Sequence, residues 1–91
     1  MPKTLHPPRS RIFAGGLLYT VSKSDIQAFF KDCGKIVEVY LAMDPERGGN
    51  LNRGFCYVQF EEPAPAAEAI RRFHNKPGPG GRKIGVRYAN E

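Results

Sequence analysis

The segment from Arg53 to Phe60, RGFCYVQF, places the strongest constraint on how this chain can fold. It is rich in residues that favour β-strands, and the side chains of a strand alternate between its two faces. One face therefore carries Arg53, Phe55, Tyr57 and Gln59, and the other carries Cys56, Val58 and Phe60. Which of these two faces is buried depends on the elements that the rest of the chain packs against this strand.

Hydrophobic periodicity divides the chain into six elements in the order strand, helix, strand, strand, helix, strand. Ser22, with Asp25 three positions later, predicts the start of the first helix, and Gly34 predicts its end. Pro63 and Pro65 are compatible with the first turn of the second helix. The predicted elements are residues 11–15, 22–34, 35–43, 53–60, 61–75 and 82–90.

This order is the ferredoxin-like split βαββαβ pattern of the α+β class, in which two helices cover one face of a four-stranded antiparallel sheet. Right-handed crossovers place the first and third strands side by side in the centre. Alternation predicts that the residues facing the core are Ile12, Ala14, Val37, Val39, Leu41, Cys56, Val58, Phe60, Ile84 and Val86. The helices turn apolar stripes towards them, made of Ile26, Phe29, Phe30, Cys33, Ala66, Ala69, Ile70 and Phe73.

The face that the helices leave open is predicted to carry four aromatic residues, Phe13, Tyr40, Phe55 and Tyr57. A cluster of this size on adjacent strands indicates a binding surface rather than isolated exposed rings. The same alternation adds Ala42, Gln59, one acid, Glu38, and the cations Arg11, Arg53, Lys83 and Arg87. Aromatic rings interleaved with positive charge are typical of surfaces that bind single-stranded nucleic acid.

The composition agrees with such a ligand. Lys and Arg number 14 against 9 Asp and Glu, which gives a net charge of +5 and a pI of about 9.5.

We expect an extended or disordered lead-in at residues 1–9 and one domain at residues 10–91. The two cysteines lack the spacing of a disulfide framework or a zinc site. Because no segment resembles a signal peptide or a membrane span, we expect the protein in the nucleus, the cytoplasm or both.

The sequence resembles a known family, the RNA recognition motif. RGFCYVQF is similar to the family's octapeptide, with Cys56 where Gly or Ala is usual. IFAGGL, at residues 12–17, is similar to its hexapeptide and departs from it at Ala14 and Gly16. The resemblance covers residues 10–90 and implies the fold predicted above.

The resemblance also implies roles for individual residues. Phe13 and Tyr57 would stack on successive bases, Phe55 would pack against a ribose, and Arg53 would pair with a phosphate. The end of the last strand would contact RNA through Arg87, Ala89 and Asn90. Alternation by itself adds Tyr40, Gln59, Arg11 and Lys83 to the predicted RNA-binding residues.

We therefore expect a domain that binds single-stranded RNA in mRNA or pre-mRNA processing, together with other ribonucleoprotein components. We expect no association with a membrane and no cofactor, metal or small-molecule substrate. No nucleophile is placed beside a base and no glycine-rich stretch has the form of a phosphate loop, so an enzyme is not expected. In the loop before the third strand, Arg47, Asn50 and Asn52 are candidates for further RNA contacts.

The alternative is a protein-binding variant of the same fold that acts as a scaffold in a ribonucleoprotein complex. Such domains carry an Arg-x-Phe tripeptide in the loop before the last strand, and RRF at residues 71–73 matches that tripeptide. Phe73, however, belongs to the apolar stripe of the predicted second helix. The chain also keeps the aromatic residues on its predicted open face. The sequence therefore favours RNA over a protein as the ligand.

Overall fold

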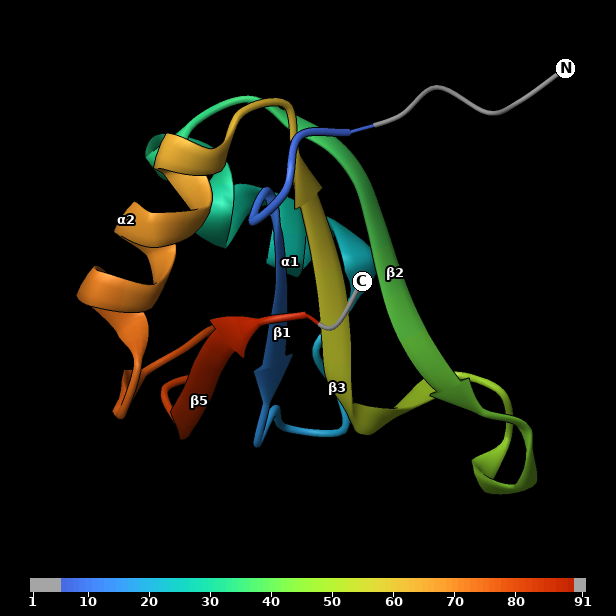
Figure 1. The fold of residues 1–91 in the computed structure, drawn as a ribbon. Coiled ribbons are helices and arrows are strands. Elements are labelled where there is room, and N and C mark those ends of the chain that lie inside the picture. Colours follow the sequence, from blue (N-terminus) through green and yellow to red (C-terminus); the bar gives the residue numbers. More distant parts are fainter. Residues whose placement is uncertain (1–5, 90–91) are drawn as a thin grey trace, which may run out of the picture.

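The computed structural model describes residues 6–89, and Figure 1 shows a sheet with α1 behind it. No helix within these residues is long and apolar enough to cross a membrane. In chain order the elements are β1 (Arg11–Gly15), α1 (Lys23–Phe30), the 3-10 helix η1 (Lys31–Cys33), β2 (Ile36–Asp44), the 3-10 helix η2 (Pro45–Arg47), β3 (Leu51–Phe60), α2 (Pro63–Phe73), β4 (Lys76–Pro77) and β5 (Lys83–Tyr88).

The strands form one sheet in the order β2-β3-β1-β5-β4, and all neighbours in it are antiparallel. The predicted α+β fold, with the first and third strands side by side, is thereby confirmed. The sheet has five strands rather than four because Lys76 and Pro77 pair with Ile84 and Lys83 at its edge. A strand of two residues is too short to show an alternating pattern in the sequence. Proline is tolerated at the edge of a sheet because no neighbouring strand needs the missing N–H.

The start of α1 follows the prediction. Ser22 Oγ accepts a hydrogen bond from the N–H of Asp25 at 3.1 Å, and Asp25 Oδ2 accepts one from the N–H of Ser22 at 2.9 Å. The hydrogen bonds from the backbone and then from the side chain of Ser22 lower the pKa of the Asp25 carboxyl. The helix is shorter than predicted, because the chain tightens into η1 after Phe30.

The core lies between the two helices and one face of the sheet. Phe30 and Phe73 join the helices with ring centroids 5.6 Å apart, and Phe29 lies 4.4 Å from Phe73. The buried strand residues in this core are Ile12, Ala14, Val39, Cys56, Val58, Phe60, Ile84 and Val86. Alternation predicts all of these strand residues to face the helices.

Two positions of β2 contradict the predicted alternation. Val37, expected in the core, is 48% exposed, and Ala42, expected on the open face, is 4% exposed. The pairing of β2 with β3 shifts at each of these positions. A β-bulge adds one residue to a strand, so strict alternation of side chains fails where it occurs.

β3 begins earlier than predicted and includes Asn52, which is fully buried. Its Nδ2 donates hydrogen bonds to the carbonyl oxygens of Leu18 and Val21, both at 2.9 Å. Its Oδ1 accepts one from the N–H of Gly54 at 2.6 Å. The expectation that Asn52 reaches RNA from a loop is therefore wrong, because this amide ties the connection between β1 and α1 to β3.

Replacing Asn52 with Ala should lower the free energy of unfolding by about 3 kcal/mol, because three hydrogen bonds of a fully buried amide are lost, although the carbonyl oxygen of Leu18 keeps its bond from the N–H of Val21. Asn50→Ala is the matched control, since Asn50 is exposed in the adjoining loop and its loss should cost less than about 0.5 kcal/mol. Urea unfolding followed by circular dichroism measures both variants. Equal stabilities would contradict the role given to the Asn52 amide.

The two thiols should differ in reactivity. Burial raises the pKa of the Cys56 thiol to about 12, and Cys33 is less buried, although desolvation also raises its pKa. At pH 8, Cys56 in a Cys33→Ser variant should react with iodoacetamide only as fast as the domain unfolds, because thiolate is the reactive form. Cys33 in a Cys56→Ala variant should react faster, as mass spectrometry would measure. Rapid labelling of Cys56 in the native state would contradict the burial of its thiol.

Candidate nucleic-acid interface

Four aromatic side chains meet on the face of the sheet that the helices leave open. Phe13 of β1 lies opposite Tyr57 of β3, which lies opposite Tyr40 of β2. The ring centroids of Phe13 and Tyr57 are 5.5 Å apart, and those of Tyr57 and Tyr40 are 6.3 Å apart. Phe55 stacks against Phe13 at 5.7 Å. The structure thus brings together the four aromatics that alternation predicts for this face.

A cation extends this arrangement to β5. Arg87 lies opposite Phe13 in the pairing of β1 with β5, and its guanidinium carbon is 4.4 Å from the centre of the Phe13 ring. Tyr40, Tyr57, Phe13 and Arg87, here called the aromatic row, therefore cross the neighbouring strands β2, β3, β1 and β5.

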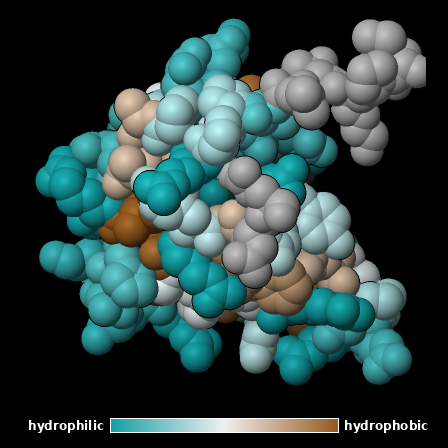
Figure 2. All heavy atoms as spheres, viewed as in Figure 1, coloured by the Kyte–Doolittle hydropathy of each residue, from teal (hydrophilic) through white to brown (hydrophobic). Residues whose placement is uncertain are grey.

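The rings of this face remain accessible. Tyr40 is 59% exposed, while Phe13, Phe55 and Tyr57 are half-buried because they pack against one another. Figure 2 shows hydrophilic side chains along most of the outline of the face seen in Figure 1, with patches of less polar side chains inside it. Flat rings within a polar rim can stack on the faces of bases whose phosphates stay in water.

The other predicted contacts differ in their surroundings. Arg53 and Lys83 are exposed, and no hydrogen bond or ion pair within residues 6–89 engages either side chain. Ala89 is buried, and its N–H donates to the carbonyl oxygen of Arg11 at 3.0 Å. Asn90 lies outside the described residues. The two cations are therefore available to phosphates, whereas the backbone N–H of Ala89 is already used.

Gln59 is only 5% exposed, although alternation predicts it on the RNA-binding surface. Its Nε2 donates to Ser10 Oγ at 2.7 Å and to the carbonyl oxygen of Phe60 at 2.8 Å. Its Oε1 accepts from Arg11 Nε at 3.1 Å. The amide of Gln59 thus holds Arg11 from inside the protein, and a direct contact of Gln59 with RNA stays a prediction.

The structure places the ring of Tyr19 against Arg47, in the connection between β2 and β3. Its ring is 44% exposed, lies 4.4 Å from the guanidinium carbon of Arg47, and adjoins Gly54. Arg47 Nε is also 3.3 Å from Asp44 Oδ2. The loop arginine that we expect to reach RNA is therefore held by two partners. The sequence carries no signal for this contact, because Tyr19 lies in a loop without periodicity.

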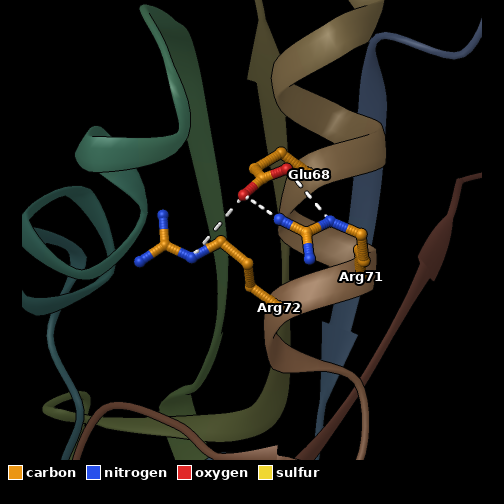
Figure 3. A network of polar contacts seen from close by, with 3 residues as sticks. All are labelled: Glu68, Arg71 and Arg72. Carbon is orange, nitrogen blue, oxygen red and sulfur yellow. Dashed lines mark hydrogen bonds and ion pairs between the residues drawn. The ribbon is translucent and has the colours of Figure 1, made fainter.

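The basic side chains of α2 are engaged within the helix. Figure 3 shows Glu68 between two arginines, with Oε2 of Glu68 2.6 Å from Arg71 Nη2 and 3.8 Å from Arg72 Nε. Phe73 packs against the rings of the first helix in the core. The Arg-x-Phe match at residues 71–73 is thus occupied by contacts inside the domain.

Comparison with known proteins places this chain in a family. The sequence model described as RNA recognition motif matches residues 12–84. The chain is 37% identical over 67 residues to Multiple RNA-binding domain-containing protein 1 of Aspergillus fumigatus, and 37% identical over 65 residues to Heterogeneous nuclear ribonucleoprotein 27C of Drosophila melanogaster. These matches cover 74% and 67% of this chain but only 8% and 15% of the relatives, so it spans a small part of their length.

Solved structures share the fold. The structure of the Rna15 RRM with bound RNA (GU) has a TM-score of 0.81 and 19% sequence identity, over 92% of this chain and 86% of that one. The family match runs from β1 into β5 and includes the three rings of the aromatic row. From its strand order, its aromatic row and the match of its sequence, this chain belongs to the RNA recognition motif family.

Proposed function

We propose that the chain binds single-stranded RNA on the open face of its sheet. The observation that carries this proposal is the aromatic row, in which three rings and one guanidinium group cross four strands. Each base that stacks on such a ring contributes about 1–3 kcal/mol. The bases of a duplex are already stacked on one another, so a flat row of rings suits a single strand.

Each side chain has a distinct part in this proposal. Phe13 and Tyr57 stack on successive bases, and Phe55, which touches both rings, packs against a ribose. Tyr40 continues the row and is its most exposed ring. Arg53 sits beside these rings without an internal partner in residues 6–89 and pairs with a phosphate.

The relatives support a ribonucleoprotein setting. One is named as a heterogeneous nuclear ribonucleoprotein and another as a protein with multiple RNA-binding domains, and the Rna15 structure contains RNA. We accordingly extend the proposal to a role in mRNA or pre-mRNA processing, in the nucleus or the cytoplasm. The protein-binding alternative has less support, because Phe73 is in the core and Arg71 is paired with Glu68.

Tyr57→Ala should weaken binding of a short single-stranded RNA by about 1–3 kcal/mol, because it removes one stacking ring. Tyr57→Phe keeps the ring and should bind nearly as well as the unmodified domain. Fluorescence anisotropy measures the affinities, and circular dichroism checks that both variants are folded. Equal affinities for the Ala and Phe variants would argue against stacking on this ring, and failure of the unmodified domain to bind would refute the proposed function.

The salt dependence of binding should identify the cations that meet phosphates. Arg53→Ala should reduce the slope of log affinity against log salt concentration by about one unit or slightly less, because one phosphate contact is lost. Arg71→Ala is the matched control, since Arg71 lies on α2 and pairs with Glu68 (Figure 3), and its slope should not change. Anisotropy titrations at several KCl concentrations give the slopes. Identical slopes for both variants would remove Arg53 from the phosphate contacts.

A further inference from the structure

A shallow depression of about 250 Å³ adjoins the aromatic row and is lined by Arg11, Glu38, Tyr40, Tyr57 and Gln59. Tyr40 and Tyr57 also belong to the aromatic row. A base seated in the depression would therefore belong to the same RNA strand as the bases stacked along the row. Its other residues are polar and differ in charge, so the depression can distinguish one base from another.

Arg11 is held at the depression by a chain of hydrogen bonds with a single direction. The Ser10 hydroxyl donates to the carbonyl oxygen of Pro7, so Ser10 Oγ accepts from Gln59 Nε2 at 2.7 Å. Gln59 Nε2 also donates to Phe60, which leaves Oε1 to accept from Arg11 Nε at 3.1 Å. The terminal nitrogens of Arg11 have no hydrogen-bond or ion-pair partner among residues 6–89, so they are available to a ligand.

Glu38 faces Arg11 from the other side of the depression. Both residues are paired with Gln59, Arg11 from β1 and Glu38 from β2. Neighbouring strands lie about 4.8 Å apart, so the backbones of Arg11 and Glu38 are about 10 Å apart. The Glu38 side chain is exposed and, in the described part of the chain, forms no ion pair. Donors and acceptors thus flank a gap that the two side chains do not close themselves.

We propose that this depression binds a guanine base of the RNA, an inference that rests on the proposed function and names the base selected at one position. The terminal nitrogens of Arg11 donate to guanine O6 and N7, the pairing that arginine makes with guanine edges. The Glu38 carboxylate accepts from guanine N1–H and from its N2 amino group. Tyr57 and Tyr40 supply the rings on which the base stacks.

The other bases fit these two residues less well. Adenine would turn its N6 amino group towards Arg11 and its N1 acceptor towards Glu38, so donors would face a donor and acceptors an acceptor. Cytosine and uracil are smaller and offer a single donor group on their pairing edge. A site built for specific hydrogen bonds discriminates strongly because a wrong base leaves its polar groups unpaired.

The test uses six-nucleotide uridine RNAs that carry one guanine at each position in turn, with affinities measured by fluorescence anisotropy. At one position, guanine should bind about tenfold tighter than adenine. At that position, inosine lacks the N2 amino group and 7-deazaguanine lacks the N7 acceptor. Each analogue should bind roughly fivefold more weakly than guanine, because each loses one hydrogen bond to a charged side chain.

Two variants assign these losses to their partners. Glu38→Ala should erase the difference between guanine and inosine, because alanine has no acceptor for the N2 amino group, and should keep the difference between guanine and 7-deazaguanine. Arg11→Ala should erase the 7-deazaguanine difference, because alanine has no donor for guanine N7, and should keep the difference between guanine and inosine. Glu62→Ala is the matched control, since Glu62 is exposed before α2 and makes no capping hydrogen bond, and it should preserve both differences.

The outcomes separate this inference from the proposed function. Tight binding of uridine RNAs with no advantage for guanine would overturn the guanine site and leave single-stranded RNA binding intact. A guanine preference that survives both Glu38→Ala and Arg11→Ala would place the selection elsewhere and overturn the inference as well. If no oligonucleotide binds, both the proposed function and the guanine site are refuted.

Discussion

The pairing of β1 with β3 is the interaction on which the rest of the domain depends. Ile12 lies opposite Val58, and both are fully buried beneath the helices. The same register sets Phe13 opposite Tyr57 on the other face. A slip of one residue would turn the rings into the core and the aliphatic side chains into water. The stability of the core and the composition of the open face therefore follow from one strand register.

Two buried amides of β3 connect this pairing to the chain around it. Asn52 bonds to backbone groups of the connection between β1 and α1, and Gln59 bonds to Ser10 and Arg11. A buried polar network whose hydrogen bonds are all formed makes the surrounding geometry rigid. Gln59 thus positions Arg11, and Asn52 positions the connection between β1 and α1. For this reason, substitution of Gln59 should change the position of Arg11 as well as the stability.

The distribution of charge complements the distribution of rings. On α2, Arg71 and Arg72 share the carboxylate of Glu68, whereas Arg53 and Lys83 on the sheet have no such partner within residues 6–89. Positive charge that is not neutralised locally attracts a polyanion and orients its approach. Electrostatic attraction and stacking therefore act on the same face, which is the arrangement that a single-stranded nucleic acid requires.

The sequence by itself determined the order of the main elements, the start of α1 and the two faces of β1 and β5, because periodicity and helix caps involve residues only a few positions apart. The tertiary structure decided the bulges at Val37 and Ala42, the short strand β4, and the burial of Asn52 and Gln59. Asn52 binds Leu18 from 34 positions away, and Gln59 binds Ser10 from 49 positions away. Alternation within one strand contains no information about such partners, because only folding brings their polar groups within hydrogen-bonding distance.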